Sequence, residues 1–192
     1  PDINVNVVDK NSKRIELWNS SNLDLLPIYE PGLDKIISRC RDKNLTFSTK
    51  IKEKISSADM IFISVNTPTK TKGIGAGQAS DLKWVEACAR EVALYANGHT
   101  IVVEKSTLPV RTAQTIKDIL FSTDCGFKNN KFTVLSNPEF LSEGTAIKDL
   151  EEPDRVLIGG DDIKAMKSLK NLYLNWVPEQ KLIFTNLWSS EL

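Results

Sequence analysis

Short apolar runs alternate along the chain with segments in which apolar residues recur at helical spacing. The run at 60–64 (MIFIS) is almost wholly apolar, which is typical of a strand covered on both faces of a parallel sheet. Ser80 and Asp81 precede an amphipathic stretch whose apolar face consists of Leu82, Val85, Cys88, Ala89, Val92 and Ala96. These two patterns predict a buried strand followed by a helix.

The same alternation continues from one end of the chain to the other. The pattern predicts strands at 3–8, 45–48, 60–64, 100–103, 132–135, 156–158 and 182–184. It predicts helices at 11–19, 32–40, 82–96 and 163–176, and another that begins at Thr107 as N-cap, with Pro109 in its first turn. Strands that alternate with helices require a doubly wound, mostly parallel α/β sheet with helices on both faces.

Composition limits the classes of partner. The chain has 192 residues, of which 41% are hydrophobic, and 25 Lys and Arg balance 25 Asp and Glu. This mixture is typical of a globular domain and excludes disordered, collagen-like and coiled-coil chains. With no net charge and no apolar run near the ~18 residues of a membrane span, we expect neither nucleic acid nor a membrane as partner.

Cysteine and histidine usage indicates a reduced compartment and no metal. Cys40, Cys88 and Cys125 lack short spacings and cannot all pair, and Cys88 lies on an apolar helix face. The single histidine, His99, is expected at the surface, and no CxxC motif is present, so a zinc site is not expected. Since the start at Pro1 does not resemble a signal peptide, we expect a cytoplasmic protein.

Polar residues follow several of the predicted strands, at the edge where open parallel sheets bind their ligands. Asp9 ends the first strand, and its carboxylate could accept hydrogen bonds from both ribose hydroxyls of an adenosine while repelling a 2′-phosphate. Arg14, one helical turn later, could stack on the adenine or reach a phosphate. An ordinary acidic strand end and a solvated helix charge remain the alternatives. The pair is a candidate site for NAD rather than NADP.

Two further loops carry hydroxyl groups. The turn after the strand at 60–64 has the sequence Val65, Asn66, Thr67, Pro68, Thr69 and could hold one edge of a cofactor. Ser106 and Thr107 follow the next strand, where a helix N-terminus could bind phosphate, water or a polarised carbonyl. A simple Asn-Pro turn and a plain helix cap are the alternatives at these positions.

Two carboxylates flank an apolar pair in the segment 137–144 (NPEFLSEG). If this segment is a helical turn, Glu139 and Glu143 share a face, and the apolar Phe140 and Leu141 would raise the pKa of one carboxyl toward acid–base use. Two exposed surface glutamates are the alternative. The position after a strand favours a functional role.

Taken together, these motifs resemble the UDP-glucose 6-dehydrogenase family. The resemblance rests on the ordered segments VD at 8–9, PIYEPG at 27–32, SVNTPT at 64–69, EKST at 104–107, NPEFLSEG at 137–144, PDRVLIGG at 153–160 and WSSEL at 188–192. It implies a Rossmann-like NAD-binding domain over residues 1–192. The implied reaction oxidises the C6 hydroxymethyl of UDP-glucose to a carboxylate and passes two hydrides to two NAD.

The resemblance also implies roles for individual residues. Thr107 is similar to the hydroxyl that holds a catalytic water, and Glu139 to the carboxylate that assists hydrolysis of a cysteine thioester. The implied NAD contacts are Asp9, Arg14, Val65, Asn66, Thr67, Pro68, Thr69, Ser106, Thr107 and Glu143. The implied contacts to the sugar nucleotide are Glu139, Phe140, Leu141, Ser142 and Glu143.

Two departures from the family pattern are expected to matter. Only eight residues precede Asp9, so the first strand and its Gly-rich phosphate loop are missing, and two buried strands would lack a partner. The substrate domain, with the catalytic cysteine, is also missing. We therefore expect an inactive fragment of an enzyme that is a homo-oligomer when complete. A sister dehydrogenase acting on GDP-mannose or a UDP-hexosamine, and a non-catalytic nucleotide-binding module, are the alternatives.

Overall fold

The computed structural model describes residues 3–74, 76–122 and 131–192. The chain divides into two compact units, Pro1–Lys54 with Leu141–Glu152, and Ile55–Phe140 with Pro153–Leu192. We call them the first and second unit. Cys125 lies outside the described residues. Within the described residues, no helix combines the length and apolar character needed to cross a bilayer.

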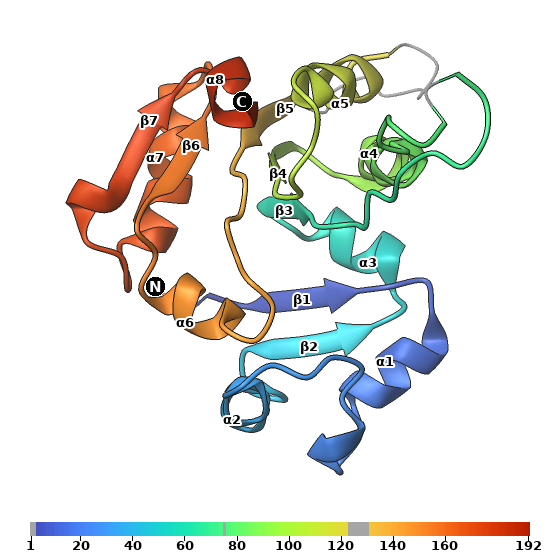
Figure 1. The fold of residues 1–192 in the computed structure, drawn as a ribbon, viewed down its shortest axis with the longest axis vertical. Coiled ribbons are helices and arrows are strands. Elements are labelled where there is room, and N and C mark those ends of the chain that lie inside the picture. Colours follow the sequence, from blue (N-terminus) through green and yellow to red (C-terminus); the bar gives the residue numbers. More distant parts are fainter. Residues whose placement is uncertain (1–2, 75, 123–130) are drawn as a thin grey trace. The chain divides into compact units, whose positions relative to one another are not determined.

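The first unit is built on two parallel strands. β1 (Val5–Val8) pairs with β2 (Leu45–Ser48) in a register that aligns Val5 with Leu45 (Figure 1). The helical elements of this unit are α1 (Ser12–Trp18), η1 (Leu23–Leu25), α2 (Leu33–Cys40) and α6 (Ala146–Glu151), and α3 (Ile51–Ser56) crosses the boundary between the units. Its small core consists of Ile15, Ile37 and Phe47. The Trp18 ring stacks on Phe47 with centroids 5.1 Å apart.

The second unit contains a five-stranded sheet in the order β3-β4-β5-β6-β7. The strands are β3 (Met60–Ile63), β4 (His99–Glu104), β5 (Lys131–Ser136), β6 (Val156–Gly159) and β7 (Leu182–Thr185). All neighbours are parallel except β5 and β6, which run antiparallel and pair at Ser136 and Gly159. The predicted α/β class with a mostly parallel sheet is confirmed.

Helices cover both faces of this sheet. They are α4 (Lys83–Tyr95), α5 (Thr112–Leu120), α7 (Ile163–Tyr173) and α8 (Leu187–Glu191), and η3 (Glu179–Lys181) precedes β7. A Cβ added to Gly159 would collide with Ser190 of α8, whereas one added to Gly160 would collide with Leu135 and come close to Met166 of α7. Because consecutive residues of an extended chain point to opposite faces, α7 and α8 lie on opposite faces.

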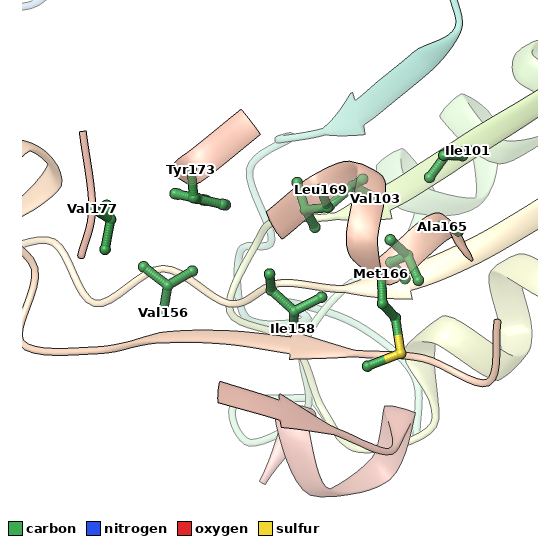
Figure 2. Close-up of a cluster of buried hydrophobic side chains, with 10 residues drawn as sticks. Ile101, Val103, Val156, Ile158, Ala165, Met166, Leu169, Tyr173 and Val177 are labelled. Atoms are coloured by element: carbon green, nitrogen blue, oxygen red, sulfur yellow. The ribbon is translucent and has the colours of Figure 1, made fainter. Parts of the chain in front are cut away.

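The core of the second unit joins α7 to β4, β5 and β6. Its fully buried members include Val103, Leu135, Ile158, Met166 and Leu169. Figure 2 shows Tyr173 and Val177 toward one end of this cluster and Ala165 and Met166 toward the other. Glycine at positions 159 and 160 lets both helices approach the sheet closely.

Several sequence expectations need correction. The helix expected to start at Thr107 starts at Thr112 instead: Pro109 disfavours a helical conformation in the residue before it, and Arg111 adopts a left-handed backbone conformation with φ +81°. The helix expected to end at 176 ends at Tyr173. Strands and helices otherwise agree with the expected segments to within about two residues, a difference typical of element boundaries. Among described residues, β1 pairs only with β2 and β3 only with β4.

Candidate functional site

The predicted site residues divide between the two units. Asp9, Arg14 and the segment 141–143 belong to the first unit, while 65–69, Ser106, Thr107, Glu139 and Phe140 belong to the second.

Asp9 and Arg14 lie together at the carboxyl end of β1. The Asp9 Oδ1 atom accepts a hydrogen bond from the Asn11 backbone N–H at 2.9 Å, and Oδ2 lies 3.8 Å from Arg14 Nη1. Asn11 in turn caps α1 by accepting from the Arg14 N–H. The Asp9 side chain remains about one-third exposed. A fixed, accessible carboxylate beside a cation at a strand end has the acceptor chemistry that two ribose hydroxyls require.

Two carboxylates hold the turn that contains Glu143. Asp149 Oδ2 accepts from the Ser142 N–H at 3.0 Å and from the Thr145 hydroxyl at 2.9 Å, and these bonds lower the pKa of Asp149. Glu30 Oε1 accepts from the Gly144 N–H at 2.9 Å. Gly144 adopts φ +84°, which favours glycine. Glu30 and Asp149 were missed as site residues, although Glu30 lies in the PIYEPG segment.

The interpretation of 137–144 as a helical turn is wrong. Residues 137–142 have no regular secondary structure, a turn covers 143–145, and α6 begins at Ala146. Pro138 and Gly144 disfavour a helix across this segment. The shared helical face of Glu139 and Glu143 therefore does not exist, and the two carboxylates belong to different units.

The loops that follow β3 and β4 are tied to each other. The Ser106 hydroxyl donates to the Val65 carbonyl at 2.9 Å, and the Lys105 N–H donates to the Ile63 carbonyl at 3.1 Å. Asn66 Oδ1 accepts from the Thr67 N–H at 3.1 Å. The structure thus brings the predicted loop at 65–69 together with Ser106, as expected for neighbouring parallel strands.

Thr107 is not a helix cap, contrary to the prediction. It is exposed and precedes the start of α5 by several residues. Glu191 occupies the helix N-terminus instead, where its carboxylate accepts from the Arg111 N–H at 2.8 Å and the Ala113 N–H at 2.7 Å. The free N–H groups expected to bind phosphate next to Thr107 are therefore bonded to a carboxylate of the chain itself.

Two ionisable residues, Glu104 and the half-buried Lys105, lie at the carboxyl end of β4. Glu104 is 1% exposed, and burial raises the pKa of its carboxyl to about 7, although the Ser136 hydroxyl donates to its Oε2 at 3.1 Å. Burial also lowers the pKa of Lys105 to about 8, against the opposing influence of Glu139 and Glu104. The positive charge of Lys105 and the negative charge of Glu139 therefore attract each other.

The remaining candidates are unremarkable. His99 is exposed at the start of β4, with Nε2 3.1 Å from the Thr133 hydroxyl, and Cys88 is half-buried on α4. In the described ranges, no group of three or more His, Cys, Asp or Glu side chains could hold a metal ion.

A mostly parallel sheet with carboxylate and hydroxyl loops at its strand ends is the arrangement in which α/β domains bind their ligands, dinucleotides among them. Residues 1–177 match the model of the UDP-glucose/GDP-mannose dehydrogenase family, NAD binding domain. The chain belongs to this family, and NAD is its cofactor.

Similar proteins agree with this assignment. Over the whole chain, 57% of residues are identical to a UDP-glucose 6-dehydrogenase of Gallus gallus and 56% to UDP-glucose 6-dehydrogenase 2 of Arabidopsis thaliana. The chain spans 39% and 40% of the lengths of these relatives.

Solved structures share the fold. A GDP-mannose dehydrogenase from Pseudomonas aeruginosa is 30% identical with a TM-score of 0.84, covering 98% of this chain and 42% of that one. A UDP-glucose dehydrogenase from Pyrobaculum islandicum is 31% identical with a TM-score of 0.83, covering 97% of this chain and 41% of that one.

Proposed function

We propose that this chain is the NAD-binding part, over residues 1–192, of an enzyme that oxidises UDP-glucose to UDP-glucuronate. The observation that carries the proposal is the identity of 55–57% to UDP-glucose 6-dehydrogenases of birds, mammals and plants, which extends over the entire chain. The proposed enzyme is cytoplasmic and homo-oligomeric.

The residues present suit NAD. Asp9 offers the accessible carboxylate that an adenosine ribose needs, with Arg14 beside it for the adenine or a phosphate. In the second unit, the cofactor would contact Ser106 and the loop bonded to it, which consists of Val65, Asn66, Thr67, Pro68 and Thr69. When bound, NAD supplies the acceptor for hydride. Glu143 would face the nicotinamide end.

The same loops would serve the substrate. Glu139 would act as general base in thioester hydrolysis on a water held by Thr107, since a base must be within hydrogen-bond reach of the proton it takes. Phe140, Leu141 and Ser142 would contact the sugar nucleotide, with Glu139 and Glu143 at their flanks. The nucleophilic cysteine would come from outside residues 1–192.

The test measures NADH formed by the complete enzyme from UDP-glucose, GDP-mannose and UDP-N-acetylglucosamine. We expect UDP-glucose to give two NADH per UDP-glucuronate and the other two sugars to react at least tenfold more slowly. A preference for GDP-mannose or the hexosamine would establish a sister dehydrogenase. Absence of NADH formation with every sugar, together with NAD binding, would favour a non-catalytic module.

A further inference from the structure

A fully buried asparagine anchors the loop that carries Glu139. Asn137 is 0% exposed and directly follows β5. Its N–H donates to the Glu104 carbonyl at 2.8 Å, its Nδ2 donates to the Leu157 carbonyl at 2.7 Å, and its Oδ1 accepts from the Tyr173 hydroxyl at 2.6 Å. The three bonds join this residue to β4, β6 and α7.

Of these three partners, Tyr173 bonds to Asn137 through its side chain, whereas the other two contribute backbone carbonyls. It is the last residue of α7 and is 4% exposed, and its ring belongs to the core cluster with Val156 and Val177 (Figure 2). Burial raises the pKa of Tyr173 to about 12, so the hydroxyl stays protonated and donates at any working pH.

The loop is fixed again just beyond Glu139. The guanidinium of Arg155 lies 4.8 Å from the centroid of the Phe140 ring, a distance suited to a cation–π interaction. Glu139 therefore lies between Asn137, which three hydrogen bonds hold in place, and Phe140, whose ring contacts Arg155. All these residues belong to the second unit.

We propose that Tyr173 is a positioning residue, which acts through Asn137 to hold Glu139 in its working place. The inference rests on the proposed function of Glu139. Removal of the Tyr173 hydroxyl would leave Asn137 Oδ1 buried without its donor, an arrangement that proteins avoid at a substantial cost in free energy. The side chain of Asn137 would then be held only by its bond to the Leu157 carbonyl, and the loop that follows would lose one of its fixed points.

The substitution Tyr173→Phe in the complete enzyme tests this step, since the ring remains to fill the core. We expect kcat to fall about tenfold, because small displacements of a reacting group are costly, while KM for UDP-glucose and NAD changes less than about twofold. Thr100→Val is the matched control. It removes another fully buried hydroxyl, one without a hydrogen-bond partner among the described residues, from the far end of β4. Its kcat should equal that of the wild type.

A double-mutant cycle with Glu139→Gln separates positioning from general destabilisation. If Tyr173 works through Glu139, Tyr173→Phe lowers kcat in the wild-type background but not in the Glu139→Gln background. Equal losses in both backgrounds, or an unchanged kcat in Tyr173→Phe, overturn the positioning role. A wild-type kcat in Glu139→Gln alone overturns the proposed function of Glu139 instead, so the two failures are distinguishable. Thermal unfolding of each variant verifies that the compared proteins are folded.

Discussion

At the residue scale, Asp9 is the side chain on which we propose that the choice of cofactor depends. Its carboxylate is held by the Asn11 N–H and lies beside Arg14, so its position is determined before any ligand arrives. A carboxylate in this place accepts from ribose hydroxyls and repels a 2′-phosphate. We therefore propose that the charge of this one residue favours NAD over NADP.

We predict that Asp9→Asn weakens NAD binding and relaxes this selectivity in the complete enzyme. Loss of a charge-assisted acceptor should raise KM for NAD roughly tenfold, and loss of the repulsion should lower KM for NADP. The measurement is the ratio of kcat/KM for the two cofactors. Asp24→Asn, which removes an exposed carboxylate from η1, is the control and should leave the ratio unchanged. An unchanged ratio in Asp9→Asn would remove Asp9 from the cofactor site.

The buried carboxyl of Glu104 makes the stability of the fold depend on pH. Burial raises its pKa from 4.5 to about 7, assisted by the negative charge of Glu191 and opposed by Ser136 and Lys105. The folded protein therefore holds this proton more tightly than the unfolded chain does. The resulting stability is fully present below pH 4.5 and is lost as the pH rises through about 7.

Glu104→Gln should remove this dependence, because the amide is permanently neutral and has nearly the same shape. The free energy of unfolding of the variant should fall less steeply between pH 5 and 8, and at pH 8 it should exceed that of the wild type by up to about 3 kcal/mol. Denaturant titrations at several pH values provide the measurement. Glu179→Gln is the control, since Lys170 lowers the pKa of that exposed carboxyl and it does not titrate in this range. Parallel curves for Glu104→Gln and wild type would contradict the prediction.

At the scale of elements, most of the second unit's strands could be predicted because their apolar runs are continuous. The helices α3, α6 and α8 escaped prediction because each is short, from five to six residues, and lacks a full period of apolar positions. The antiparallel pairing of β5 with β6 was not predicted either, because it consists of a single bridge between Ser136 and Gly159. The start of α5 follows Arg111, whose left-handed backbone conformation is uncommon for a residue other than glycine and is not marked by any sequence pattern.

The N-terminus of α5 is capped by a residue of α8. Glu191 bonds to the Arg111 and Ala113 N–H groups from 78–80 residues away in sequence, a cap that no local pattern predicts. We predict that Glu191→Ala lowers the free energy of unfolding by about 1–2 kcal/mol, as loss of a helix cap usually does. Glu191→Gln keeps an acceptor oxygen and should lose less. Urea denaturation compares the variants, and equal stability of Glu191→Ala and wild type would exclude a capping role.

At the scale of the whole molecule, the positions of the candidate loops could be predicted from the sequence, but the contacts that hold them could not. The segments at 65–69, 104–107 and 137–144 follow strands as expected, because strand ends in an α/β fold are marked by an abrupt change from apolar to polar residues. The contacts that hold those loops come from residues far away in the chain, such as Tyr173 on Asn137 and Glu30 on Gly144. Single-sequence patterns carry no information about such pairs.

We predict that residues 1–192 alone are catalytically inactive. Oxidation to a carboxylate through a thioester needs a cysteine nucleophile, which the family resemblance assigns to a substrate domain outside residues 1–192. Of the cysteines in the described residues, neither Cys40 in α2 nor Cys88 in α4 follows a strand, where the candidate loops lie. The isolated 192-residue chain should therefore produce no NADH from UDP-glucose and NAD, while the complete enzyme at equal concentration does. Cys40→Ser and Cys88→Ser in the complete enzyme should keep wild-type kcat, which separates these thiols from the nucleophile. NADH production by the isolated chain, or loss of turnover in either serine variant, would place the nucleophile within these residues and require a different assignment of the catalytic groups.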